Sequence, residues 1–196
     1  GGVVRGISLT LNKWGYDSLI LEHQRGKEGL VGLLSDIGES LRLFPSRAAE
    51  LASGVDFLVE NIPHLKIVIT GVSWGAIYNN EVMERLEGSP RVYGIEAGVP
   101  FWYKEPAPTN TLAVNDTGIV PDKLSQGDLA AVLRSCFSAP FRWVNHRLHG
   151  ESVRFSDCVN VPGHQYYWNY PEVQSQIIAF LADNFGITHR SMEGGS

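Results

Sequence analysis

The sequence has little of what marks several large classes of protein. Its 196 residues contain two cysteines, Cys136 and Cys158. They lie in no CxxC or Cys/His spacing, so the sequence predicts no metal site and at most one disulfide, with two buried, reduced thiols as the plainer expectation. The 16 lysines and arginines are scattered and the net charge is −5, which argues against nucleic-acid binding. No apolar run approaches the ~20 residues of a membrane span, and no signal peptide is visible.

The composition is that of a globular protein. Hydrophobic residues make up 43% of the chain and charged residues 19%, and the length suits one domain over residues 1–196 with a substantial core. No internal repeat, linker or low-complexity tract divides the chain. We therefore expect a single folded unit.

Short aliphatic runs alternate with helical patterns along the chain. This alternation predicts an α/β fold with a mostly parallel central sheet and helices on both faces. The predicted strands are Asp17–His23, Lys66–Thr70, Arg91–Ala97, Thr111–Asp116 and Asp157–Val161. The predicted helices are Val3–Leu11, Ser46–Asn61, Ala76–Glu87, Asp128–Cys136 and Pro171–Asn184. The irregular stretches 100–108 and 137–156 are expected to be substrate-side loops, because long loops often carry function.

A GxSxG motif supplies the candidate nucleophile. Gly71-Val72-Ser73-Trp74-Gly75 follows the apolar run Ile67–Ile69 and precedes a helical pattern, which is the strand–turn–helix context that the motif requires. A serine at a tight, strained turn projects its hydroxyl clear of the sheet. The backbone amide of Trp74, at a helix N-terminus, is placed to stabilise an oxyanion. The alternative is an inert serine in a glycine-rich turn.

His164 is the candidate general base. It lies in Val161-Pro162-Gly163-His164, after the last predicted strand and before the last amphipathic helix. A neutral imidazole there can take the serine proton and return it to the leaving group. A buried, merely hydrogen-bonded histidine is the alternative.

The third member of a triad must hold the imidazole in the correct tautomer. Asp116 is favoured because it ends a predicted strand and gives the chain order Ser, Asp, His. Asp122, further along the same loop, and Glu96, at the end of the preceding strand, remain open. We expect Asp122 to be solvated or to cap the next segment.

Taken together, these motifs resemble the α/β-hydrolase superfamily, nearest to its esterases, lipases and cutinase-like members. Gly15-Tyr16, a strand and Glu22-His23-Gln24-Arg25-Gly26 resemble its GY–strand–DxRG segment, and Gly71–Gly75 resembles its nucleophile elbow. Asn115-Asp116 with Ile119-Val120-Pro121 resembles its acid loop, with one extra residue. Gly163-His164 followed by Pro171-Glu172-Val173 resembles its histidine loop and final helix. The resemblance implies an α/β-hydrolase-like fold and a Ser-Asp-His triad.

The sequence departs from that family in one important place. The family has a strand ending in a His-Gly loop upstream of the GY segment, and this loop supplies the second oxyanion amide. Here only Gly1-Gly2 and the Val3–Leu11 helix precede it, so we expect the N-terminal strand to be missing or reduced. Either Gly2 or a segment such as Gln24–Gly29 then supplies the second amide.

The resulting expectation is a serine hydrolase that cleaves a carboxylic ester through an acyl-serine intermediate and needs no cofactor. Its partner is a small-molecule ester or acyl substrate. The aromatic residues Phe101, Trp102, Trp143 and Tyr166 are the candidates for lining the acyl pocket, against the plainer reading that each is an ordinary core or rim residue. A thioesterase, peptidase or acyltransferase uses the same triad. A non-catalytic binding module that retains the hydrolase fold is the alternative from a different class.

Overall fold

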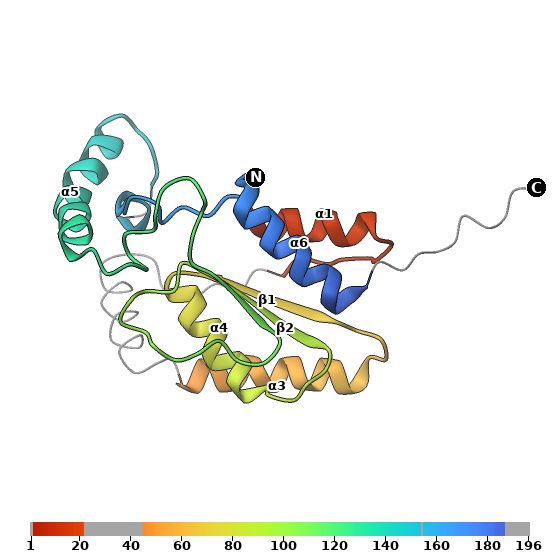
Figure 1. Cartoon of the computed structure of the whole chain (residues 1–196). Coiled ribbons are helices and arrows are strands. Elements are labelled where there is room, and N and C mark those ends of the chain that lie inside the picture. The colour runs from red at the N-terminus through yellow and green to blue at the C-terminus, as the bar shows by residue number, and fades with distance from the viewer. Residues whose placement is uncertain (1, 22–44, 154, 187–196) are drawn as a thin grey trace, which may run out of the picture.

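The computed structural model describes residues 2–21, 45–153 and 155–186 (Figure 1). Its elements, in chain order, are α1 (Val3–Lys13), α3 (Pro45–Asn61), β1 (Ile67–Val72), α4 (Trp74–Arg85), β2 (Val92–Ala97), β3 (Thr111–Val114), α5 (Leu129–Leu148), the short 3-10 helix η1 (Phe155–Cys158) and α6 (Pro171–Phe185).

The three strands form one parallel sheet with the order β1-β2-β3. Central β2 is buried along its whole length, and its register pairs Gly71 of β1 with Glu96 and Glu96 with Ala113 of β3. A parallel sheet carries helices on its faces because each crossover must return to the starting edge. The prediction of an α/β fold with a parallel sheet is therefore confirmed.

Helices cover both faces of this sheet. In Figure 1, α1 and α6 lie on one side, and α3 and α4 lie on the other. Side chains alternate along β2, so Tyr93 and Ile95 face the first pair while Val92 faces the second. The α6 core positions are Val173, Ile177, Leu181 and Phe185, at helical spacing.

The ends of the last helix follow the expected chemistry. Pro171 occupies its first turn, where the missing N–H is not needed, and Gly186 ends it with a positive φ of 66°. The N-cap residue is Tyr170, whose side chain makes no capping hydrogen bond.

Two predicted strands are not strands. Residues 17–21 of the predicted Asp17–His23 strand have no strand pairing, and the rest of it lies outside the described residues. Leu19 and Leu21 are 83% and 78% exposed. The predicted Asp157–Val161 strand is replaced by η1 and a loop. An apolar run becomes a strand only where a neighbour satisfies its backbone groups, and neither run pairs with a described strand.

The stretch 137–156, expected to be a loop, is largely helical. Helix α5 continues from Leu129 through Pro140 to Leu148, and Asp128 caps its start by accepting a hydrogen bond from the Ala131 backbone N–H. Pro140 lies within this helix and does not end it. Within the described residues, no helix is both long and apolar enough to cross a membrane.

Cys136 and Cys158 are not joined by a disulfide. Cys136 is exposed on α5 and Cys158 is buried at the end of η1, so the expectation of two buried thiols is wrong for Cys136.

The turn between β1 and α4 is built on a very close backbone approach. A Cβ at Gly71 would overlap the backbone carbonyl of Gly75 in the first turn of α4. Neither strand nor helix can retreat easily, because both are packed against β2. Only a residue without a side chain fits at this position.

We therefore expect Gly71→Ala to lower the free energy of unfolding by at least about 2 kcal/mol, as over-packing does elsewhere. Gly54→Ala is the matched control, since a Cβ there meets nothing within 4 Å on the exposed face of α3. Alanine is the better helix former, so that variant gains about 0.5–1 kcal/mol. Urea unfolding of both variants measures the difference, and equal midpoints would contradict the close-approach argument.

Candidate active site

Ser73 lies in a strained turn between β1 and α4. Its φ of 57° and ψ of −120° put a non-glycine residue in a region that side chains rarely adopt. Strain of this kind costs about 1–3 kcal/mol and clusters at functional sites. The Ser73 backbone N–H donates to the Ala97 carbonyl at 2.9 Å, which ties the turn to the end of β2. The half-buried serine therefore stands at the edge of the sheet where the strands end.

His164 reaches the same edge from the loop between η1 and α6. Its ring packs on Gly98, the residue directly after Ala97: a Cβ at Gly98 would lie 2.8 Å from His164 Cε1. Ser73 and His164 are thus held at adjacent positions at the end of β2, one through a backbone bond and the other through ring contact. His164 Nε2 is buried and has no hydrogen-bond partner among the described residues.

Asp122 is the carboxylate that pairs with His164. The His164 Nδ1 and Asp122 Oδ2 atoms are 2.9 Å apart, and Asp122 is fully buried. Because an ionised carboxylate only accepts, Nδ1 carries the proton and Nε2 is left as the basic nitrogen. This is the tautomer that a general base requires.

The Asp122 carboxylate accepts further hydrogen bonds. The Tyr166 hydroxyl donates to Oδ2 at 2.7 Å and the Ser125 hydroxyl at 2.9 Å. The backbone N–H groups of Leu124 and Ser125 donate to Oδ1. Burial by itself would raise the pKa of Asp122, but the hydrogen bonds from His164 and Tyr166 outweigh it and hold the pKa below its ordinary value. Asp122 therefore stays charged without contact with water.

The prediction that Asp116 pairs with His164 is wrong, because the imidazole is hydrogen-bonded to Asp122 instead. Strand β3 ends at Val114, so Asp116 already lies exposed in the following loop. Among the described residues its carboxylate accepts a hydrogen bond from the Gly118 backbone N–H, at 2.9 Å, and none from His164. The chain then turns back, and the Lys123 backbone N–H donates to the Pro162 carbonyl in the histidine loop. That pairing brings Asp122, expected to be solvated, beneath the imidazole. Asp122 does also cap the following turn, as expected.

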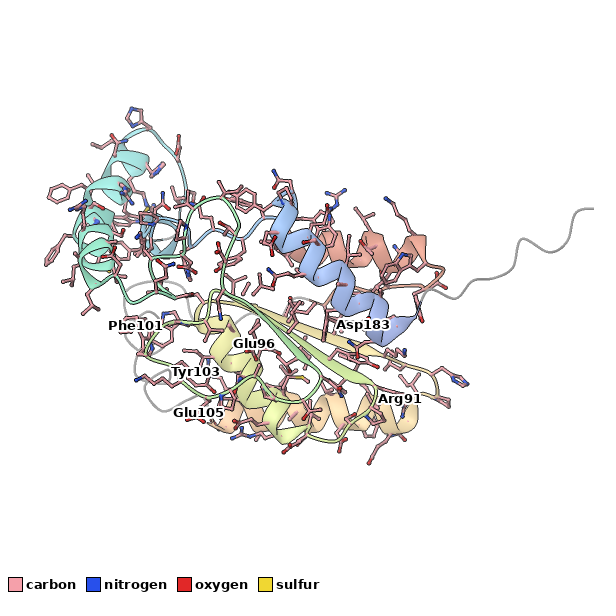
Figure 2. The ribbon with its side chains drawn as sticks, in the orientation of Figure 1. Arg91, Glu96, Phe101, Tyr103, Glu105 and Asp183 are labelled. Atoms are coloured by element: carbon pink, nitrogen blue, oxygen red, sulfur yellow. The ribbon has the colours of Figure 1, made fainter. Side chains whose placement is uncertain are left out.

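Glu96, the other candidate for the triad acid, lies in a different environment and makes no hydrogen bond with His164. It is 1% exposed and its Oε2 lies 3.5 Å from the Nδ2 of Asn80 on α4. Figure 2 labels it with Phe101, Tyr103 and Glu105, which share with it the lining of a cavity of about 300 Å³. Burial raises the pKa of Glu96 to about 7. None of Ser73, Asp122 and His164 lines that cavity.

Of the two expected oxyanion donors, the structure places Trp74 beside Ser73 but not Gly2. Trp74 opens α4, and the N–H groups of a first helical turn have no partner within the helix. Its amide is therefore available directly beside Ser73. Gly2 is exposed at the start of α1, where its carbonyl accepts from the Gly6 N–H, and no contact ties it to Ser73. The other suggested source, Gln24–Gly29, lies outside the described residues.

The four aromatic candidates for the acyl pocket do not form one group. The rings of Trp102 and Trp74 have centroids 5.4 Å apart, so Trp102 lies close to the nucleophile turn, and Phe101 packs on Trp102. Trp143 lies on α5 against Phe155 and Arg147.

Tyr166 is buried and donates to Asp122, and its ring meets the His164 ring edge-on. Sequence reasoning thus assigned Tyr166 to substrate and missed its role beneath the acid. The position of Tyr166, two residues after His164, was the sequence feature that could have indicated this role. Among the residues that the structure describes, no cluster of His, Cys, Asp or Glu is arranged to hold a metal ion.

The raised pKa of Glu96 makes stability depend on pH. The folded protein keeps the proton between about 4.5 and 7, so the stability contributed by neutral Glu96 falls as pH rises through that window. We expect Glu96→Gln to match wild type near pH 4.5 and to exceed it by up to about 3 kcal/mol above pH 7.

Thermal unfolding of the two proteins across this range measures the difference. Glu105→Gln, which removes an exposed carboxylate on the same cavity, serves as the control and should show no such trend. A difference between Glu96→Gln and wild type that does not vary with pH would refute the assignment.

Comparison of the chain with protein-family models, with curated proteins and with solved structures finds no match.

Proposed function

We propose that the protein is a serine hydrolase that cleaves a carboxylic ester, with Ser73 as nucleophile, His164 as general base and Asp122 as the orienting acid. The observation that carries the proposal is the His164–Asp122 pair, in which a buried carboxylate holds Nδ1. The buried Nε2 has no hydrogen-bond partner among the described residues, the Ser73 hydroxyl included, and its ring lies at Gly98, next to the Ala97 carbonyl that holds the strained serine turn. A histidine serving only structure would have both nitrogens satisfied.

The reaction follows from these positions. His164 Nε2 takes the Ser73 hydroxyl proton as the oxygen attacks the ester carbonyl, and the buried Asp122 carboxylate stabilises the imidazolium that forms. The Trp74 amide, at the positive end of α4, faces the developing oxyanion. The imidazolium then gives its proton to the leaving alkoxide. In the second half, water attacks the acyl carbon while His164 takes its proton, and the bond to the Ser73 oxygen breaks. The imidazolium returns that proton to Ser73 as the acid leaves.

The fold supports the same proposal. A serine turn after one parallel strand, an acid in the loop after a later strand and a histidine before the last helix follow the order that the α/β-hydrolase family uses. We therefore propose an α/β-hydrolase-like domain. The acid loop differs from the pattern read from the sequence, because Asp122 follows Pro121 instead of preceding it.

One observation favours the alternative of a non-catalytic binding module. Within the described residues the Trp74 amide is the one oxyanion donor with an evident place, since Gly2 lies elsewhere. Loss of one such donor costs about 2.7–4 kcal/mol of transition-state stabilisation. Against it, a non-catalytic protein has no need to maintain a strained serine beside a buried acid–histidine pair.

A fluorophosphonate probe separates these two functions. We expect it to label the wild-type protein on Ser73, because the probe needs both an activated hydroxyl and an oxyanion site. Ser73→Ala should abolish labelling, whereas Ser175→Ala, which removes an exposed hydroxyl on α6 outside the candidate site, should leave labelling on Ser73. Mass spectrometry of the labelled peptide identifies the residue. An unlabelled wild-type protein would favour the binding module.

The acid is tested by the rate of that labelling and by turnover of a small ester. Asp122→Asn replaces one carboxylate oxygen with an NH₂ group among five hydrogen-bond donors and allows the imidazole to adopt the other tautomer, so we expect a loss of about two to four decades in kcat. Asp116→Asn is the matched control and should change kcat by less than about threefold, because Asp116 is exposed. Circular dichroism establishes that both variants fold. The reverse ranking would return the role to Asp116 and leave Ser73 and His164 in place.

A further inference from the structure

Helix α5 carries an apolar stripe that faces away from the protein. Its six members are each about half exposed or more, and Phe137, Phe141 and Leu148 reach 74%, 79% and 80%. The full stripe is Leu129, Leu133, Phe137, Phe141, Val144 and Leu148. At roughly 100° per residue these positions fall on one side of the helix along its whole length of about 30 Å. Singly exposed apolar residues need no explanation, but a continuous stripe does.

The opposite side of α5 contacts the rest of the molecule. Ala139 is fully buried, and the Ser135 hydroxyl donates to the Asn160 carbonyl at 2.9 Å. The Arg142 guanidinium donates to the Cys158 carbonyl. These contacts fix the rotation of the helix, so the stripe points outward. In Figure 1, α5 stands apart at the end of the molecule at which α4 begins, away from the helices that cover the sheet.

The charge of α5 is opposite to that of the chain. Helix α5 contains Arg134, Arg142 and Arg147 and no aspartate or glutamate, whereas the chain as a whole has a net charge of −5. On the helical projection, exposed Arg134 and Arg147 border the stripe on its two sides. Arginines in this position extend their charged ends sideways from an apolar surface to meet anionic groups.

We propose that α5 docks the protein on the surface of an anionic lipid bilayer, with the stripe among the acyl chains and Arg134 and Arg147 at the lipid phosphates. An amphipathic helix with Leu and Phe on one face and arginines at its borders binds in this way through apolar burial together with attraction to anionic headgroups. The inference does not depend on the catalytic proposal.

The same charges argue against a second copy of the chain as the occupant. Pairing two α5 stripes in a symmetric dimer would bring Arg134 and Arg147 of both copies to one interface, and Leu129–Leu148 contains no carboxylate to neutralise them. Asp128, at the N-cap, interacts with Arg134 of its own copy. A bilayer that contains anionic lipid offers both the apolar layer and the opposite charge.

Co-sedimentation with vesicles tests the proposal. The vesicles are phosphatidylcholine alone or phosphatidylcholine with about one-third phosphatidylglycerol. We expect wild type to bind the anionic vesicles and to bind the neutral ones at least tenfold more weakly. Added salt should weaken binding to the anionic vesicles, since it screens the arginines.

Two variants separate the apolar and charged contributions. The double variant Phe137→Ser and Phe141→Ser should bind anionic vesicles at least tenfold more weakly, and because both rings are exposed the fold should be unaffected. The double variant Arg134→Gln and Arg147→Gln should lose roughly fivefold for each arginine on anionic vesicles. Phe57→Ser is the matched control, since Phe57 is 63% exposed on α3, where Leu58 is the other exposed large apolar residue among those described, and it should bind as wild type does.

Several results would overturn the proposal. The first is a wild-type protein that does not bind anionic vesicles. The second is a phenylalanine-to-serine double variant that binds them as well as wild type does. The third is a loss of binding in Phe57→Ser equal to that of the double variant. Light scattering gives one more: a wild-type dimer that the two phenylalanine substitutions convert to monomers would assign the stripe to a second copy.

Discussion

The buried carboxylate of Asp122 is the constraint on which the arrangement of the candidate site depends. It accepts hydrogen bonds from two backbone amides in its own loop and from three side chains, of which two belong to the histidine loop. A buried charge is tolerable only when it is fully hydrogen-bonded. The need to satisfy Asp122 therefore fixes the loop after β3 and the loop before α6 relative to each other, and His164 is positioned as a result.

Two buried carboxylates, one on strand β2 and one in the loop after β3, have pKa values shifted in opposite directions. Beyond Ala97 the strand ends against Ser73 and His164, where a charged acid is stabilised by donors. One residue earlier, on the face toward α4, Glu96 is buried with one weak partner and holds its proton to about pH 7. Burial acts to raise the pKa of both carboxylates, but the pKa of Asp122 is lowered because five donors satisfy it, whereas burial dominates at Glu96.

The sequence could predict those parts of the site that depend on local pattern. The GxSxG motif, the run before it and the helical pattern after it together specify a strand, a turn and a helix, and the structure has all three. The histidine before the last helix was likewise readable from its neighbours. The acid was not, because burial of Asp122 depends on the pairing of Lys123 with Pro162, 39 residues apart in the chain, and on the Tyr166 hydroxyl. Local pattern favoured Asp116, the first carboxylate after the predicted strand.

The secondary structure that the sequence failed to predict has similar physical causes. The runs 17–21 and 157–161 are apolar enough for strands, but a strand requires a partner that only the tertiary structure supplies. The helix α5 continues through Pro140, and its apolar residues do not mark a core. Periodicity alone reports an amphipathic helix without saying whether the protein itself covers the apolar face.

The contact between Trp74 and Trp102 gives the molecule an optical property. The two indole rings have centroids 5.4 Å apart and planes at 49°, close enough for their electronic transitions to couple, so we expect paired circular-dichroism bands of opposite sign. One of the two rings belongs to the residue directly after Ser73. Any displacement of the serine turn, by a bound molecule or by a covalent adduct, thus alters the spectrum of the unlabelled protein.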